Sequence, residues 1–234
     1  SINKLDEIQH PSVREVLRYL NSTEGLEIHH DGDLPARSGL GSSSAFTVGM
    51  LNALSALQGL RISKEKLATE AIRIEQKVIK ENVGSQDQIA VAYGGFNKIE
   101  FSKNGDFEVE QLIIPNIKYN LLQDHLVLFF TGISRISSNI AGDIIKDFHL
   151  IEKEMNIIES FVEKGLKILT NPDEDIIEFG YLLNEYWHVK KSLNKKISNP
   201  AIDKIYNKAI KAGAIGGKLL GSGGGGFLLF FVKP

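Results

Sequence analysis

The 234-residue sequence predicts a protein of mixed helices and strands in two consecutive parts. Three observations favour this class. Long stretches carry apolar residues at helical spacing, and shorter stretches alternate apolar and polar residues as strands do. A continuous apolar strand, His125 to Phe130, comes after a hairpin pattern and lies in a second part that begins near Asn120. A chain of this length can bury a sizeable core.

Composition and charge exclude several classes of protein. The formal net charge of −2 argues against a general nucleic-acid binder, which needs a basic face to neutralise phosphates. No apolar run is long enough to span a bilayer, and the first residues lack the apolar core of a signal peptide. Without cysteine there is no disulfide framework and no thiolate metal site. We expect a cytoplasmic protein with neither nucleic-acid nor membrane partners.

The first part is predicted to be mainly helical. A helix is expected over residues 13–20, with Pro11 suited to its first turn. The alternation in residues 26–29 predicts a strand. Residues 46–57 are apolar on several faces, which is typical of a buried helix. An amphipathic helix follows from Ser63, a good N-cap residue, to Lys80.

Glu75 lies on the apolar side of the helix predicted over residues 63–80. Its neighbours three and four positions away are Ala71, Ile72, Val78 and Ile79. A buried carboxylate is costly unless it meets a cation or hydrogen-bond donors. A salt bridge to an Arg or Lys elsewhere is one interpretation, and a metal held by Glu75 with a serine at a helix end is the other.

The remaining elements follow the same patterns. Residues 96–101 and 107–113 alternate around a turn and predict a hairpin. Helices are expected over residues 137–163, 172–193 and 200–212, and a strand from Phe227. The pairs Lys190-Lys191 and Lys195-Lys196 are interpreted as a solvated face. Four successive glycines, residues 223–226, are expensive in folding entropy and suggest close backbone approach to a ligand, although a plain flexible hairpin is the alternative.

A glycine-serine loop precedes the predicted buried helix. It reads Gly39-Leu40-Gly41-Ser42-Ser43-Ser44, with Pro35 four residues before Gly39. Glycines let the backbone approach a ligand, and serines at a helix start can cap free amides. Those amides and the positive end of the helix dipole bind anions such as phosphate. An ordinary serine-capped helix is the simpler interpretation.

Four spaced motifs together resemble the GHMP small-molecule kinases over essentially the whole chain. They are the glycine-serine loop, the helix bearing Glu75, the Gly84-Ser85-Gln86-Asp87-Gln88 segment, and the run from Lys218 to Phe227. With Tyr93-Gly94-Gly95 and Thr131-Gly132-Ile133-Ser134-Arg135, they are most similar to the heptose 7-phosphate kinase branch of that family. Its members supply activated heptose for bacterial surface polysaccharide.

The resemblance implies an α+β fold in two parts. Residues 1–119 would form an ATP-binding half like domain 2 of ribosomal protein S5. This half would be incomplete at its start, since the N-terminal strands of the family are missing from this sequence. Residues 120–234 would form a ferredoxin-like half, truncated at its end. The implied activity is ATP-dependent phosphorylation of a sugar hydroxyl, with heptose 7-phosphate as substrate. A fucose or galactose kinase and a non-catalytic nucleotide or sugar sensor are the alternatives, and a homodimer stays open.

The resemblance also implies roles for individual residues. Asp87 would accept a proton from the attacking hydroxyl or orient it. Ser43 and Glu75 would hold Mg²⁺, which prefers oxygen ligands. The ATP-binding residues would be Pro35, Gly39, Leu40, Gly41, Ser42, Ser43 and Ser44. The substrate would be bound by Arg135, Gly221, Gly223, Gly224 and Gly225, with a domain-interface salt bridge as the alternative role for Arg135.

Overall fold

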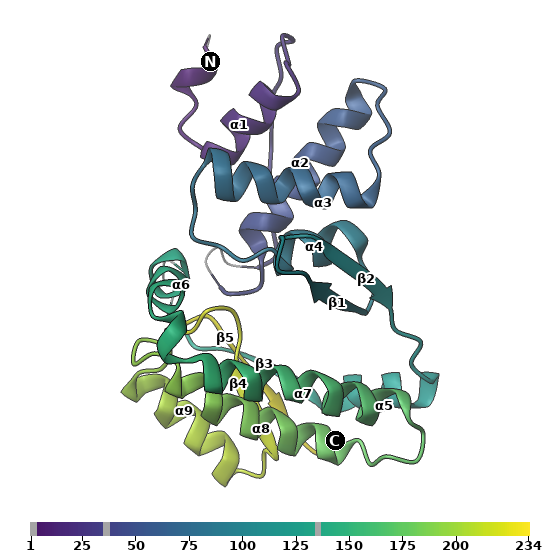
Figure 1. Ribbon diagram of the computed structural model, residues 1–234, viewed down its shortest axis with the longest axis vertical. Helices are drawn as coiled ribbons and strands as arrows, with labels where there is room; N and C mark the ends of the chain where they lie inside the picture. Colours follow the sequence, from purple (N-terminus) through teal and green to yellow (C-terminus); the bar gives the residue numbers. More distant parts are fainter. Residues whose placement is uncertain (1–3, 35–37, 134–136) are drawn as a thin grey trace. The chain divides into compact units, whose positions relative to one another are not determined.

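The computed structural model describes residues 4–34, 38–133 and 137–234 (Figure 1). The chain forms two compact units, residues 1–36 with 41–111 and residues 37–40 with 112–234. The first unit ends at residue 111, whereas the sequence predicted a boundary after residue 119, and Gly39 and Leu40 of the glycine-serine loop belong to the second unit.

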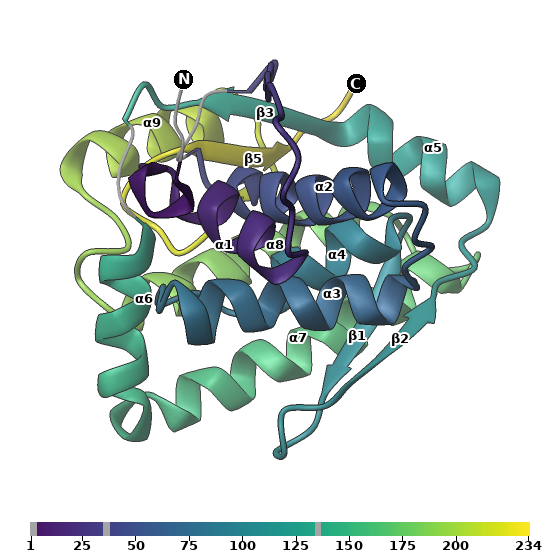
Figure 2. The same cartoon turned by 90° about the horizontal axis from the view of Figure 1, so that it is seen from above.

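Four helices and a hairpin make up most of the first unit. The helices are α1 (Pro11–Tyr19), α2 (Ser42–Leu57), α3 (Lys64–Arg73) and α4 (Gln86–Tyr93), and the hairpin strands are β1 (Asn97–Phe101) and β2 (Phe107–Gln111). A 3₁₀ turn, Leu5–Glu7, precedes α1, and α3 continues into a π-helical turn, Ile74–Val78. In Figure 2, α2 lies beside α1 and α3, which agrees with their packing in a shared apolar core.

The helix and hairpin predictions for this unit are confirmed, whereas the strand over residues 26–29 is wrong. Ser63 caps α3 by accepting a hydrogen bond from the Lys66 amide at 3.2 Å. Residues 25–30 form no regular element, and Leu26 and Ile28 are exposed. Alternation of apolar and polar residues is insufficient for a strand because the backbone also needs a paired neighbour. No described strand pairs with this segment.

The second unit combines a three-stranded antiparallel sheet with five helices among its described residues. The helices are α5 (Asn116–His125), α6 (Ser137–Lys146), α7 (Glu152–Thr170), α8 (Ile177–Ser192) and α9 (Pro200–Lys211), and the strands are β3 (Leu126–Phe130), β4 (Gly216–Leu219) and β5 (Phe227–Phe231). The strand order is β3-β5-β4, with Leu126 opposite Phe231 and Leu219 opposite Leu228. Trp187 of α8 packs with Leu219 and Leu228 in its core.

Two helices of this unit differ from their predicted bounds. The helix expected over residues 137–163 is divided into α6, a 3₁₀ turn (Phe148–Leu150) and α7. This turn leaves Phe148 and Leu150 exposed and is followed by the buried Ile151, so the apolar residues here do not form one continuous buried face. The helix expected over residues 172–193 begins only at Ile177, after a turn in which the Ile177 amide donates to Asp175 Oδ1.

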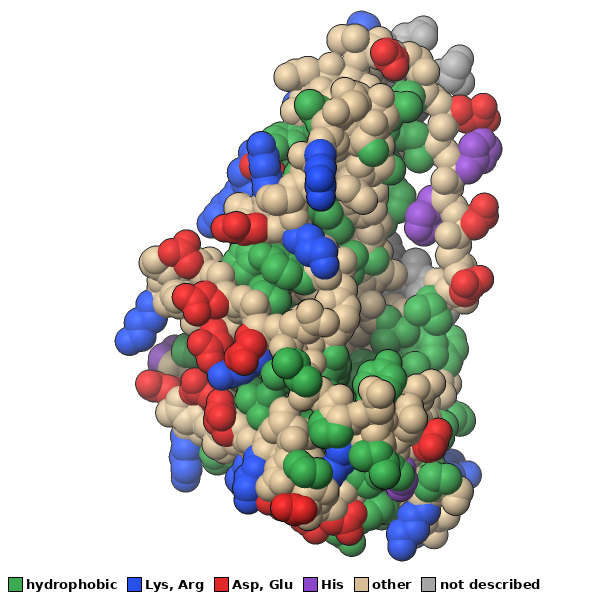
Figure 3. Space-filling view, turned by 90° about the vertical axis from the view of Figure 1, so that its right-hand side faces the viewer, with side chains coloured by type: hydrophobic (Ala, Val, Ile, Leu, Met, Phe, Trp, Pro, Cys, Tyr) green, Lys and Arg blue, Asp and Glu red, His purple; other side chains and the backbone are tan. Residues whose placement is uncertain are grey.

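Apolar side chains also reach the surface. Figure 3 shows hydrophobic groups exposed in several places on one face of the molecule. In the second unit, four consecutive residues of β3, Val127 to Phe130, are each at least 40% exposed. Among the described helices, none combines the length and apolar character needed to cross a membrane.

Candidate active site

A glycine, and not a serine, occupies the N-cap of α2, so no N-cap side chain bonds the amides of its first turn. Gly41 adopts the left-handed conformation with φ of 71°, and the helix has no capping hydrogen bond from that residue. The prediction that serine hydroxyls cap this helix is therefore wrong. A Cβ atom disfavours this backbone conformation, which explains the glycine. The uncapped first turn keeps its amides available for an anion.

Glu75 is buried in the first unit, as its position in the sequence predicts, and is only 1% exposed. It lies in the π-helical turn after α3, and such turns are frequent at functional sites. The Ser44 hydroxyl of α2 donates to Glu75 Oε2 at 2.9 Å. The Gln88 side-chain amide of α4 donates to the same oxygen. No salt bridge to Glu75 exists among the described residues, so that interpretation is wrong.

Two buried acceptors in this cluster have no hydrogen-bond donor in the described part of the chain. They are Glu75 Oε1 and Gln88 Oε1. A buried acceptor without a donor costs about 1–3 kcal/mol, so it favours an added donor or cation. Carboxylate and amide oxygens of this kind are suitable ligands for a hard divalent cation. The described residues contain no group of three or more Asp, Glu, His or Cys side chains placed to bind a metal unaided.

Asp87 lies on α4 close to the start of α2. A Cβ atom built on Gly41 would lie 3.1 Å from Asp87 Cγ, so only a glycine leaves ordinary space there. Although the Asp87 side chain is exposed on one side, surrounding protein raises the pKa of its carboxyl group through desolvation, and the charge of Glu75 raises it further. The same two causes raise the pKa of Glu81. The charge of Glu75 thus acts on both neighbouring carboxyl groups.

Ser43, the other predicted metal ligand, is exposed in the first turn of α2. Its carbonyl oxygen accepts a hydrogen bond from the Thr47 hydroxyl at 3.2 Å. The neighbouring Ser44 is the serine that contacts Glu75. The metal role of Ser43 therefore stays a prediction, as do the ATP-binding roles of the loop. Pro35 and Arg135 lie outside the described residues.

In the second unit, residues 38–40 pack against the glycine loop of residues 221–226. The Phe227 amide donates to the Ser38 carbonyl at 3.2 Å. A Cβ atom on Gly226 would lie 2.0 Å from that carbonyl oxygen, and one on Gly221 would lie 2.9 Å from Gly39 Cα. Both glycines have positive φ. The first half of the glycine-serine loop is thus held against the late glycine loop.

The other glycines of the late loop approach the protein's own backbone. The Gly224 amide donates to the Ile197 carbonyl at 2.6 Å, and a Cβ atom on Gly223 would lie 2.6 Å from Ile197 Cα. A Cβ atom on Gly225 would lie 2.5 Å from the Ile133 carbonyl oxygen. Close packing within the second unit therefore requires these glycines. A role for them in binding substrate stays a prediction.

Lys190 holds the same loop from α8, and its interpretation as a solvated residue is wrong. It is 8% exposed, and its ammonium group donates to the carbonyls of Leu219 at 2.9 Å and Gly221 at 2.5 Å. A signal was present in the sequence: Lys190 follows Trp187 by three positions and Leu183 by seven, which places it on the buried face. Gln88 had no such signal, because its partner depends on tertiary packing.

Models of known families match both parts of the chain. The GHMP kinases N-terminal domain matches residues 10–95, and the GHMP kinases C-terminal domain matches residues 157–234. D-glycero-alpha-D-manno-heptose 7-phosphate kinase of Campylobacter jejuni is 31% identical over 99% of this chain and 68% of its own length. L-fucokinase/L-fucose-1-P guanylyltransferase of Bacteroides fragilis is 28% identical over 97% of this chain and 24% of its own.

Solved structures agree on the fold. A D-glycero-D-manno-heptose 1-phosphate kinase from Bacteroides thetaiotaomicron has a TM-score of 0.64 and 28% identity, over 96% of this chain and 63% of its own. The mevalonate kinase of Methanococcus jannaschii has a TM-score of 0.70 and 23% identity, over 95% of this chain and 66% of its own. The chain thus spans about two thirds of these solved chains, and their folds confirm the predicted α+β class. On these matches, the chain belongs to the GHMP kinase family.

Proposed function

We propose that the full-length protein transfers the γ-phosphoryl group of ATP to a sugar hydroxyl. The acceptor we propose is the anomeric hydroxyl of D-glycero-D-manno-heptose 7-phosphate, which would give the 1,7-bisphosphate. The observation that carries the proposal is the position of Asp87 beside Gly41, where α2 begins with an uncapped turn. Family membership and the similarity to the Campylobacter enzyme support it.

The nucleotide phosphates would bind at the start of α2. Backbone amides of the first turn donate to phosphate oxygens, and the helix dipole favours the negative charge. The glycine at position 41 keeps a side chain out of the space between the start of α2 and Asp87. Since an ATP-consuming kinase works where ATP is abundant, we place the protein in the cytoplasm.

The oxygen donors near Glu75 fit Mg²⁺. Glu75 would supply the unpaired Oε1, and Ser43 would supply its exposed hydroxyl from the first turn of α2. When bound, Mg²⁺ neutralises charge that develops on the transferring phosphoryl group. Burial is the main cause of the raised pKa of Asp87 and Glu81, and the charge of Glu75 adds to it. A bound cation would lower the electrostatic cost of these neighbouring carboxylates.

Asp87 would act on the acceptor hydroxyl. As the sugar oxygen forms a bond to the γ-phosphorus, the bond from that phosphorus to the β–γ bridging oxygen breaks and ADP leaves. The hydroxyl proton passes to the Asp87 carboxylate. A raised pKa makes Asp87 a better proton acceptor than an ordinary exposed aspartate.

A panel of acceptors assayed with the full-length protein and Mg-ATP tests this proposal. We expect turnover of heptose 7-phosphate to exceed that of fucose, galactose and mevalonate. Faster turnover of fucose would favour the second candidate, which the similarity to the Bacteroides fucokinase supports. ATP binding without transfer to any of these acceptors would instead identify a nucleotide sensor and overturn the kinase proposal.

A further inference from the structure

The hydrogen bonds to the Glu75 carboxylate are distributed unevenly. Oε2 accepts from both the Ser44 hydroxyl and the Gln88 amide, while Oε1 accepts from no described residue. Both carboxylate oxygens are strong acceptors, and a structural role alone would favour one donor on each. The arrangement instead satisfies one oxygen fully and leaves the other open.

Gln88 is built into this position by three elements of the first unit. It is 0% exposed on α4, Glu75 lies in the π-helical turn, and Ser44 lies on α2. The amide of Gln76, next to Glu75, donates to the Val83 carbonyl and the Ser85 hydroxyl, each at 3.1 Å. These bonds join the π-helical turn that carries Glu75 to the segment just before α4, which carries Gln88.

Asp87 precedes Gln88 on α4 and points in a different direction. Successive side chains on an α-helix point about 100° apart, since there are 3.6 residues in each turn. With Gln88 directed inward to Glu75, Asp87 is directed to Gly41 at the start of α2. The backbone of α4 thus directs one of these neighbouring side chains to Glu75 and the other to Gly41.

We propose that Gln88 is a positioning residue that, together with Ser44, occupies Glu75 Oε2 and thereby keeps Oε1 free and directed for Mg²⁺. This inference rests on the proposed function. Partners of metal ligands orient the ligand and typically change metal affinity or activity by about 10–100-fold when removed. Gln88 touches neither nucleotide nor acceptor in this proposal, and it acts only through Glu75.

Nucleotide binding at varied Mg²⁺ concentration tests the proposal without relying on turnover. In the full-length protein, Gln88→Met keeps the side-chain length and removes the amide. We expect this variant to bind ATP in EDTA as tightly as the parent does. The Mg²⁺ concentration that gives half of the maximal enhancement of ATP binding should rise by about 10–100-fold. At saturating Mg²⁺, kcat should largely recover. Gln86→Met is the matched control, because Gln86 is exposed on the same helix, and we expect its Mg²⁺ requirement to equal the parent's.

Ser44→Ala provides a second test if Gln88→Met fails to fold. It removes the other hydrogen-bond donor to Glu75 Oε2 with little change in side-chain volume. We expect it to raise the Mg²⁺ requirement in the same direction. A parental Mg²⁺ requirement in the folded variants would overturn the role of Gln88. Failure of the proposed function looks different: the parent itself would bind ATP independently of Mg²⁺, or Glu75→Gln would leave that dependence intact.

Discussion

At the scale of single residues, the site gathers groups that are unfavourable for folding. Glu75 is a buried carboxylate with one oxygen unpaired, and Asp87 has a raised pKa because protein surrounds it and Glu75 lies near. Ionised groups with raised carboxyl pKa destabilise the folded state at neutral pH. Titratable groups with shifted pKa values cluster at functional sites. The loss of folding stability caused by these carboxyl groups therefore indicates a functional site.

Asp87→Asn should lower turnover and at the same time raise the stability of the folded protein at pH 7. The folded-state pKa of Asp87 lies above its unfolded value, so its ionisation disfavours folding as pH rises through that folded pKa. The neutral Asn removes this penalty, and we expect a higher Tm at pH 7 and no difference at strongly acid pH, where Asp87 is protonated in both states. Turnover should fall roughly 10²-fold or more, the scale of general-base catalysis, with ATP affinity retained.

Thermal melts at pH 7 and at acid pH, together with steady-state kinetics, measure both effects. Asp106→Asn is the control, because Asp106 lies in the exposed hairpin turn. Near-parental turnover in Asp87→Asn would remove Asp87 from the mechanism.

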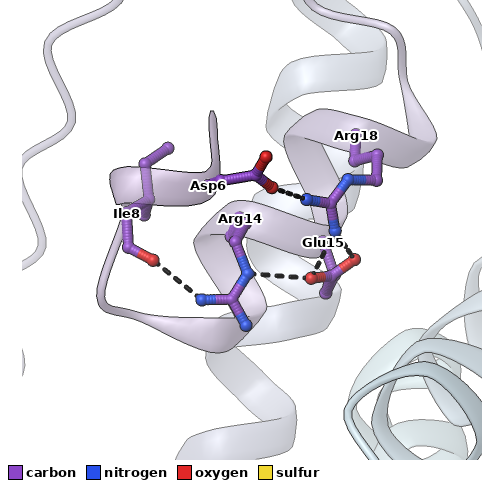
Figure 4. Close-up of polar contacts among 5 residues, drawn as sticks. All are labelled: Asp6, Ile8, Arg14, Glu15 and Arg18. Atoms are coloured by element: carbon purple, nitrogen blue, oxygen red, sulfur yellow. Dashed lines mark hydrogen bonds and ion pairs between the residues drawn. The ribbon is translucent and has the colours of Figure 1, made fainter. Parts of the chain in front are cut away.

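At the scale of elements, α1 is tied to the preceding turn by an ionic cluster (Figure 4). Arg18 bridges Glu15 and Asp6, each at 2.5 Å, and Arg14 bonds Glu15 at 2.9 Å and the Ile8 carbonyl at 2.8 Å. The hydrogen bond from Arg18 is the main cause that lowers the pKa of Glu15, and burial acts against it. One carboxylate thus holds two arginines of a short helix.

Glu15→Gln should make stability less sensitive to acid. A lowered folded-state pKa contributes stability above the unfolded pKa and loses it as pH falls through the folded value. We therefore expect the variant to unfold at a lower urea concentration than the parent at pH 7, with the difference closing as the pH is lowered through the acid range. Urea titrations over that range measure it.

Glu7→Gln is the matched control for this cluster, because Glu7 is exposed in the adjoining 3₁₀ turn. We expect its urea midpoint to follow the parent's at every pH. A constant difference between Glu15→Gln and the parent across the acid range would mean that packing, and not charge, explains the effect.

At the scale of the whole molecule, the second unit is assembled from two segments far apart in the sequence. Residues 38–40 join residues 112–234 through the hydrogen bond from the Phe227 amide to Ser38 and the close approach of Gly226. The glycine-serine loop is therefore divided, with Gly41 and α2 in the first unit. Its first half packs against the late glycine loop, whereas Gly41 packs against Asp87.

Gly226→Ala should destabilise the protein more than Gly105→Ala. Both glycines have φ of 93°, which costs an alanine roughly 1–2 kcal/mol on its own. A Cβ atom on Gly226 would lie 2.0 Å from the Ser38 carbonyl oxygen, whereas one on Gly105 would meet nothing within 4 Å. We expect a clearly larger fall in the free energy of unfolding for Gly226→Ala, measured by urea denaturation. Equal losses would show that backbone conformation alone requires Gly226.

The sequence by itself determined most helices, the β1–β2 hairpin, the strand pattern of β3 and β5, and the burial of Glu75. Each of these depends on spacing over a few residues, where apolar periodicity and turn residues act locally. The family motifs, read with their spacing, also indicated the α+β fold and the chemistry.

Only the tertiary structure decided which partners these residues meet. Residues 26–29 alternate like a strand but have no described neighbour to pair with, and Glu75 meets Ser44 and Gln88 where an ion pair was one expectation. Lys190 turns inward to two carbonyl oxygens. Periodicity predicts the buried face of an element, whereas hydrogen-bond partners come from elements far along the chain, and their positions exist only after packing.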